Sequence, residues 1–298
     1  MIDKLEFFLA LAREQHFGHA AEECGVTQPT LSAGIKQLEE TLGVMLVQRG
    51  SRFQGLTPEG QRVLEWARRI VGDTRTMREE MRATHHGLAG HVRIAAIPTA
   101  LAMTPRLTTP FRDKHPNVTF SIISRTSIEV LTLLDNFEID IGITYLENEP
   151  LGRVTSVPIY SERYRLITAA GNVYSDRESV SWAEVSSLPL CLLTPDMQNR
   201  RIINRHLAEA GVEAHATLES NSMIVLFSHI RTGKWASIMP LNLAETFGFS
   251  EPIRAIPIVE PDASHIVGVV AAHRDPNTPI VSALLHEARG LAAALGSV

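Results

Sequence analysis

The sequence has few cysteines, no long apolar run and no export signal, and each absence excludes a class of protein. Its two cysteines, Cys24 and Cys191, stand far apart in 298 residues, which excludes a disulfide-stapled secreted scaffold and argues against a cysteine zinc site. No run approaches the roughly 18 uncharged apolar residues of a membrane span. The first residues also lack the basic flank, apolar core and cleavage site of a signal peptide. We therefore expect a cytoplasmic protein without a membrane span, metal or cofactor.

An excess of positive charge is missing as well. The chain has 28 Lys and Arg against 33 Asp and Glu, a net charge of −5. A phosphate-binding surface usually needs positive charge, so this average argues against a nucleic-acid partner unless the basic residues are segregated. What is present is enough apolar material, 44% of the residues, to bury real cores in two or three domains.

Residues 1–58 predict a small all-helical domain. A short helix from Phe17 to Glu23 is closed by Gly25. The next helix has Thr27 as its N-cap and Pro29 in its first turn, and Gly43 ends it. Two short helices joined through a glycine turn, the second well capped, describe a helix-turn-helix over about residues 18–37.

The second helix of this motif is expected to bury one face and present the other. Leucine and isoleucine at helical spacing form the expected inward face, namely Leu31, Ile35, Leu38 and Leu42. The outward positions that can read bases or contact phosphate are Gln28, Pro29, Thr30, Ser32 and Lys36. Arg49 and Arg52 lie in a turn-rich stretch with no acidic residue, which suits a wing on the DNA backbone. A structural helical hairpin is the alternative, and the caps, polar positions and isolated arginines favour DNA binding.

Residues 59–90 predict a long helix followed by a hinge at Gly87 and Gly90. Five apolar residues and one threonine step 4-3-4-3-4 along it: Val63, Ala67, Ile70, Thr74, Met77 and Met81. This period of 3.5 is typical of a coiled-coil seam and predicts a dimerisation helix. The alternative is a long helix that lies on its own domain.

Residues 91–298 alternate apolar strands with helical segments, the pattern of an α/β domain. Two α/β halves in series predict a first lobe of about residues 91–162 and 268–298, and a second lobe of about 163–267. Such halves usually enclose a cleft, and ligands bind there at the carboxyl ends of the strands.

Small polar residues follow several of these strands at the starts of helices. Thr126 and Glu129 have capping-box spacing, and free N–H groups at helix starts favour an anion without any arginine. The predicted effector-binding residues are Thr99, Ala100, Thr126, Ser127, Thr144, Thr194, Asn221 and Ser222. The alternative is that these side chains are ordinary helix caps.

The stretch HFGHAAEECGVTQPTLSAGIKQLEETLGVMLVQRGSRFQGLTPEG resembles the winged helix-turn-helix of LysR-type transcriptional regulators nearly residue for residue. The resemblance implies a DNA-binding domain, a linker helix and a two-lobed effector domain similar to type 2 periplasmic binding proteins. By this resemblance the seven candidate DNA-binding residues face DNA, and Thr99 and Ser127 match the family's usual pocket positions. Ala33 and Gly34 stand where many members have longer polar side chains, which leaves base contact there open.

The sequence therefore predicts a regulator that binds promoter DNA and a small, anionic inducer. It is expected to be a homodimer or homotetramer and not an enzyme. RNA polymerase is a further candidate partner. Parts of the effector region, such as LLTPDMQNRR, also resemble regulators found beside formate dehydrogenase operons, without establishing formate as the ligand. Two alternatives stay open: a solute-binding or enzymatic α/β module with a helical appendage, and a structural adaptor.

Overall fold

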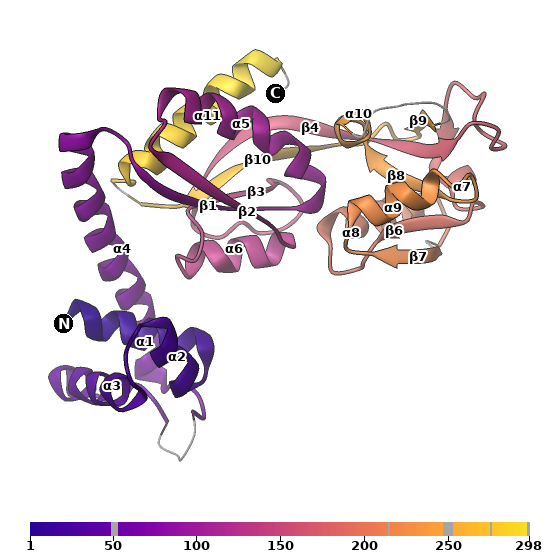
Figure 1. Cartoon of the computed structure of the whole chain (residues 1–298). Coiled ribbons are helices and arrows are strands. Elements are labelled where there is room, and N and C mark those ends of the chain that lie inside the picture. The colour runs from indigo at the N-terminus through magenta and orange to yellow at the C-terminus, as the bar shows by residue number, and fades with distance from the viewer. Residues whose placement is uncertain (49–52, 214, 247–252, 275, 297–298) are drawn as a thin grey trace. The chain divides into compact units, whose positions relative to one another are not determined.

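The computed structural model describes residues 1–48, 53–213, 215–246, 253–274 and 276–296. The chain forms two compact units, one made mostly of residues 1–87 and the other mostly of residues 88–296 (Figure 1). Each unit has its own hydrophobic core.

The first unit contains the predicted helix-turn-helix. Its helices are α1 (Ile2–Glu14), α2 (Phe17–Glu23), α3 (Gln28–Leu42) and the start of α4 (Pro58–His86). The Thr27 hydroxyl accepts the Thr30 N–H at 3.4 Å, and Gly43 ends α3 in the left-handed conformation with φ 69°. Val47 and Leu56 form an antiparallel bridge on either side of residues 49–52. Arg49 and Arg52 themselves lie outside the described residues.

The core of this unit fixes which face of α3 points outward. Leu31, Ile35 and Leu38 are buried as predicted, whereas Leu42 is 41% exposed, so the prediction for Leu42 was wrong. Leu42 is the last residue of α3, where the core of the unit no longer covers the helix. Gly34 also faces inward, because a Cβ at this position would lie 2.7 Å from Phe7 Cδ2 of α1. The absence of a side chain at position 34 therefore permits close packing of α1 on α3 and excludes base contact there.

The predicted seam on α4 divides into two parts. Ala67 is fully buried in the core of the first unit, and Val63 packs against the same core. These two residues therefore correct the dimerisation prediction: the alternative of a helix on its own domain holds for the first turns of α4. Ile70, Met77 and Met81 are 40%, 56% and 59% exposed, so the apolar seam reaches the surface only beyond Ala67.

The second unit is built on one continuous run of strands in the order β2-β1-β3-β10-β4-β8-β6-β7. The first lobe contributes β1 (Gly90–Ala96), the 3-10 helix η1 (Pro98–Met103), α5 (Thr104–Lys114), β2 (Val118–Ser124), α6 (Ser127–Asp135), β3 (Ile141–Tyr145) and α11 (Pro279–Leu295). The second lobe contributes β5 (Val180–Ser181), α7 (Trp182–Val185), β6 (Leu190–Leu193), α8 (Gln198–Glu209), β7 (Ala216–Ser220), α9 (Met223–Ile230), β8 (Ala236–Pro240), α10 (Leu241–Thr246) and β9 (Ile253–Val259).

Two long strands, β4 (Val154–Ala169) and β10 (Ser264–Ala272), join the lobes. The first part of β4 pairs antiparallel with β10, which also pairs with β3, and its last part pairs with β8 and β9. Through its pairing with β3, β10 brings the end of the chain back to the first lobe.

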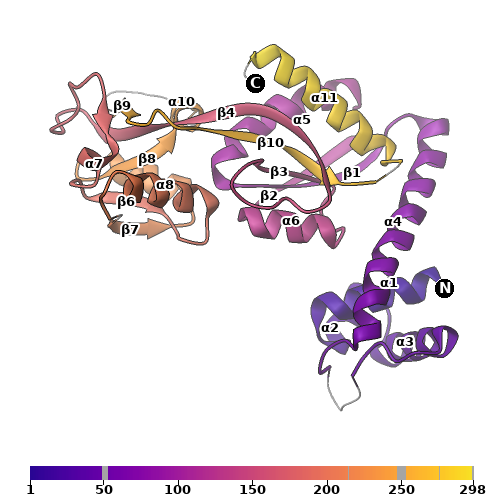
Figure 2. The same ribbon diagram turned by 180° about the vertical axis from the view of Figure 1, so that it is seen from behind.

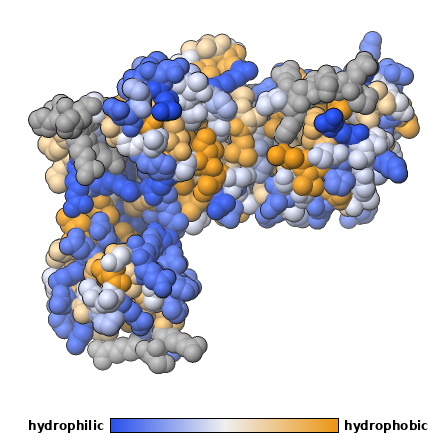
Figure 3. Space-filling view, in the orientation of Figure 1, coloured by the Kyte–Doolittle hydropathy of each residue, from blue (hydrophilic) through white to orange (hydrophobic). Residues whose placement is uncertain are grey.

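Helices cover both faces of each lobe. In the first lobe, α5 and α11 lie on one face of the sheet and α6 on the other (Figures 1 and 2). In the second lobe, Leu190 and Leu192 pack with α8, whereas Cys191 and Leu193 pack with α9. Because successive residues of a strand point to opposite faces, α8 and α9 cover opposite sides of the sheet. On the face that Figure 3 shows, hydrophobic residues reach the surface of both lobes, whereas the first unit is mainly hydrophilic.

Candidate functional site

The outward face of α3 is solvent-exposed over its first turns. Gln28, Pro29, Thr30, Ser32 and Lys36 are all exposed, and their side chains are not enclosed by the core. The pairing of Lys36 with Glu40 is long, at 4.0 Å, and both side chains are largely exposed. A pair of this kind is weak, so it does not prevent Lys36 from contacting a phosphate.

Two residues, Glu39 and Thr57, hold the segment after α3 in place. The Glu39 carboxylate accepts the N–H groups of Leu46 at 2.7 Å and Val47 at 3.2 Å. The Thr57 hydroxyl donates to the Met45 carbonyl at 2.6 Å and accepts the Gly60 N–H at 2.9 Å. One end of this segment is thus tied to α3 and the other to the start of α4.

The second unit has a cleft of about 660 Å³ between its lobes. The first lobe contributes Pro98, Leu101, Ala102, Ser124, Arg125, Thr126 and Glu129. The second lobe contributes Asp196, Met197, Asn221, Ser222, Met223, Ile224, Leu243 and Thr246. An apolar cavity with a few convergent polar groups between two lobes is the usual form of a small-molecule site.

The structure brings together three of the eight predicted effector residues, Thr126, Asn221 and Ser222. Thr126 also makes the predicted capping box, because its hydroxyl accepts the Glu129 N–H at 3.2 Å and Glu129 accepts the Thr126 N–H at 2.8 Å. Ser222 precedes α9 without capping it, so its hydroxyl is available to a ligand.

Four of the other predicted residues are buried and are not among the residues that line this cleft, so their role in effector binding stays a prediction. Thr99 is 3% exposed and lies 3.5 Å from the Tyr145 hydroxyl, and Ala100 is fully buried. Thr144 is fully buried in β3, a central strand that is flanked by β1 and β10. Ser127 is 2% exposed and donates to Glu149 at 3.1 Å.

Thr194 also does not line the cleft. Its hydroxyl oxygen is buried, and it has no hydrogen-bond partner among the described residues. The sequence reading missed Arg125, which lies immediately before Thr126 at the end of β2 and supplies the only arginine among the described lining residues.

Polar contacts fasten the two lobes beside the cleft. Arg201 of α8 pairs with Glu149 at 2.6 Å and donates to the Ser127 hydroxyl at 3.4 Å. The Gln198 amide donates to the Glu147 carbonyl at 3.0 Å. The segment after β3 and the start of α8 are therefore held together by charge-assisted and neutral hydrogen bonds.

A buried carboxyl lies where β4 passes between the lobes. Tyr145 donates to Glu162 at 2.5 Å and Tyr160 donates to it at 3.2 Å. The Asn199 amide lies 3.3 Å from the hydroxyls of both Tyr145 and Tyr164. Burial raises the pKa of Glu162 to about 7, although the hydrogen bonds from Tyr145, Thr99 and Tyr160 oppose this shift.

Within the described ranges, no helix is both long and apolar enough to span a bilayer. The same part of the chain holds no group of three His, Cys, Asp or Glu side chains that could bind a metal ion.

A helix-turn-helix with an exposed, capped second helix, joined to a two-lobed domain with a ligand-sized cleft, is the architecture of a DNA-binding regulator with an effector-binding domain. The family of bacterial regulatory helix-turn-helix proteins of the lysR type matches residues 2–61, and the LysR substrate binding domain family matches residues 85–293. The chain belongs to the LysR family of transcriptional regulators, so the enzymatic alternative is set aside.

Known relatives extend over nearly the whole chain. The DNA-binding transcriptional dual regulator OxyR of Escherichia coli (strain K12) is 26% identical over 282 residues, which cover 94% of this chain and 91% of that protein. A full-length OxyR variant from Pseudomonas aeruginosa has a TM-score of 0.76 at 25% identity, with coverage of 97% and 94%. CbnR bound to its target DNA shares the fold, with a TM-score of 0.62 at 21% identity and coverage of 98% and 99%.

Proposed function

We propose that this regulator acts in the cytoplasm as a homo-oligomer that binds promoter DNA through α3 and changes its DNA binding when a small molecule occupies the cleft. The observation that carries the proposal is the exposed row from Gln28 to Lys36 on a capped helix. Ligand occupancy alters the arrangement of the oligomer only through unequal affinity for two arrangements. RNA polymerase is a candidate partner at the promoter.

Operator binding by α3 is tested by Gln28→Ala, with Gln37→Ala as a matched control on the same helix. Gln37 is also exposed but lies near the other end of α3. A bidentate contact to adenine contributes about 1–3 kcal/mol of discrimination, so Gln28→Ala should weaken operator binding about 5- to 150-fold in a gel-shift titration. Equal affinities of the Gln28→Ala and Gln37→Ala proteins would contradict base reading by Gln28. Arg52→Ala, although outside the described residues, should weaken all duplexes alike.

Oligomer formation is proposed to use the exposed part of the α4 seam. Ile70, Met77 and Met81 are apolar and exposed, which is unfavourable for a helix that stays single. Met77→Glu should shift the protein toward monomer in analytical ultracentrifugation. Arg69→Glu places the same charge on an exposed position off the seam and should not. Whether dimers pair further into tetramers is read from the same experiment.

The effector is proposed to be a small carboxylate or similar anion with an apolar body. Arg125 and Ser222 supply polar contacts, while Leu101, Met197 and Met223 supply an apolar wall. A thermal-shift screen with small carboxylates tests this, and Arg125→Gln should remove the shift. Ser222→Ala should reduce it, whereas Ser228→Ala, at an exposed position of α9, should not. A shift that survives Arg125→Gln would contradict an anion at this position.

The resemblance of the effector region to regulators found beside formate dehydrogenase operons makes such an operon the first target to test. Chromatin precipitation in the source organism should enrich the promoter of that operon with the intact protein and enrich it less with the Gln28→Ala variant. Enrichment confined to unrelated promoters would overturn it.

A further inference from the structure

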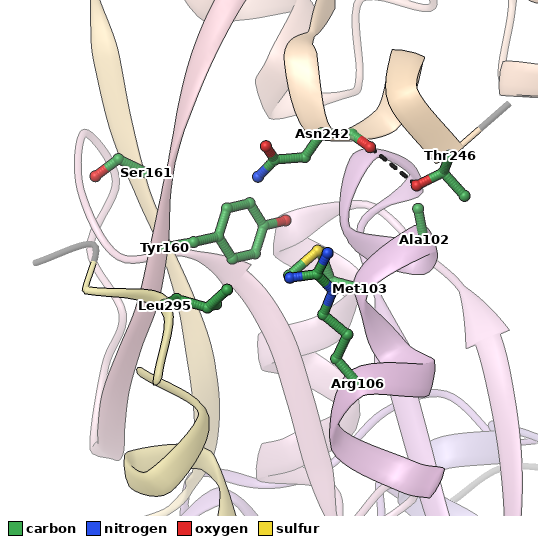
Figure 4. A pocket seen from close by; sticks show the side chains of 8 residues that line it. All are labelled: Ala102, Met103, Arg106, Tyr160, Ser161, Asn242, Thr246 and Leu295. Atoms are coloured by element: carbon green, nitrogen blue, oxygen red, sulfur yellow. Dashed lines mark hydrogen bonds between the residues drawn. The ribbon is translucent and has the colours of Figure 1, made fainter. Parts of the chain in front are cut away.

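A second cavity, of about 440 Å³, lies on the other side of the contact between η1 and α10. Its described lining comes from five elements of the second unit and comprises Ala102, Met103, Arg106, Tyr160, Ser161, Asn242, Thr246 and Leu295. Ala102 and Thr246 also line the effector cleft, so these two residues form a shared wall. Figure 4 shows Arg106, Tyr160 and Asn242 pointing toward the same space from η1–α5, β4 and α10.

The second cavity differs from the cleft in its charge. Arg106 is its one charged lining residue among those described, and it forms no hydrogen bond or ion pair with any described residue. The cleft, in contrast, has Arg125 together with the carboxylates of Glu129 and Asp196. An unpaired guanidinium in a concave site attracts an anion, and its planar donors match the two oxygens of a carboxylate.

The remaining lining groups describe what the ligand carries besides its charge. The Tyr160 hydroxyl already donates to Glu162, so it can only accept a further hydrogen bond. The Asn242 amide can donate to a second carboxylate oxygen, since no described residue accepts from this side chain, whereas Ser161 points away from Arg106 (Figure 4). Ala102, Met103 and Leu295 form the apolar part of the wall and leave room for a short hydrocarbon chain.

We propose that this cavity is a second ligand site that takes an organic monocarboxylate, with the carboxylate on Arg106 and the hydrocarbon part against Met103 and Leu295. The site is distinct from the cleft, because Arg106, Met103 and Leu295 do not line the cleft. An occupant that moves Ala102 or Thr246 changes the cleft as well, so the two ligands affect each other's affinity reciprocally.

Hexanoate is a suitable probe, with hexanamide as its uncharged counterpart of the same shape. Isothermal titration of the full-length protein should show saturable hexanoate binding and at least tenfold weaker hexanamide binding. Arg106→Gln should weaken hexanoate binding at least tenfold, whereas Arg112→Gln, an exposed arginine on the same helix, should leave it unchanged. Equal binding of both probes, no binding of hexanoate, or unchanged binding by Arg106→Gln would each overturn the proposal.

A second variant removes space instead of charge. Leu295→Trp fills the apolar side of the cavity and should also weaken hexanoate binding, without removing the guanidinium. Arg125→Gln in the cleft should leave the hexanoate site intact, which separates this proposal from the one for the effector. Loss of hexanoate binding in Arg125→Gln but not in Arg106→Gln would assign the ligand to the cleft and overturn the second site. Operator affinity, measured in parallel, tests the regulatory function independently.

Discussion

The Nε2 atoms of His206 in α8 and His265 in β10 lie 3.0 Å apart, and both side chains are buried. The Asn148 amide donates to His265 Nδ1, so His265 carries its proton on Nε2 and donates it to His206. His206 is then protonated on Nδ1, from which it donates to Glu209 at 3.2 Å. Each imidazole ring is neutral in this series of hydrogen bonds, and a second proton on either ring would remove one of these hydrogen bonds.

The histidine pair predicts that stability falls on acidification. Burial lowers the pKa of His265 to about 4 and lowers the pKa of His206, while unfolded histidines titrate near about 6.5. Below about pH 6.5 the unfolded state therefore binds more protons, and stability is lost progressively down to about pH 4. The midpoint of thermal unfolding should fall over this range. The double variant His206→Gln, His265→Gln should show a smaller fall. His215→Gln, at an exposed position, should keep the full fall, and equal pH profiles for all three proteins would contradict this account.

The buried carboxyl of Glu162 predicts a pH dependence of opposite sign. Its pKa is about 7 in the folded protein and about 4.3 in an unfolded chain, so the folded state binds the proton more tightly. This contribution is complete below about pH 4.3 and is lost as the pH rises through 7. Glu162→Gln keeps a neutral side chain at every pH. The unfolding midpoint of the variant should therefore rise relative to that of the unsubstituted protein between pH 5 and 8. A difference in midpoint that stays constant with pH would show that Glu162 does not ionise in this range.

The helix-turn-helix and most central strands could be predicted because local signals set them. Thr27 and Gly43 delimit α3, and apolar runs such as residues 118–124 coincide with a strand. The first half of β4 has no clear strand pattern in the sequence, because Pro158 interrupts it. In the structure Pro158 stands opposite Gly268 where the pairing of β4 with β10 is irregular, a position that tolerates the missing N–H.

The cleft could be predicted as a place but not residue by residue. Thr99, after β1, and Thr144, within β3, are buried in the protein interior, whereas Asn221, after β7, lines the cleft. This difference in burial depends on how the second lobe covers the first, and the local sequence around each residue does not predict that. The division of the α4 seam has the same origin, because Ala67 is taken up by the core that α1 and α3 provide.

Gly60 is predicted to tolerate no side chain. A Cβ at this position would lie 2.1 Å from the Leu46 carbonyl oxygen, which also accepts the Thr57 N–H at 3.0 Å. Gly60→Ala must displace backbone and should lower the free energy of unfolding of the first unit by about 1–3 kcal/mol, measured by urea denaturation. Gly290→Ala is the control, since its Cβ would meet open space within α11. It should be stabilising by up to about 1 kcal/mol, and equal effects of the two variants would contradict the steric argument.

Cys191 is predicted not to respond to oxidants. Its side chain is fully buried in β6, and burial raises the pKa of the thiol to about 11, so the reactive thiolate is scarce at neutral pH. In a Cys24→Ser background, the native protein should not react with Ellman's reagent until it is unfolded. Operator affinity should be the same before and after peroxide treatment, and Cys191→Ala should not change that result. A peroxide-dependent change in affinity that Cys191→Ala abolishes would show that the strand opens enough to expose this thiol.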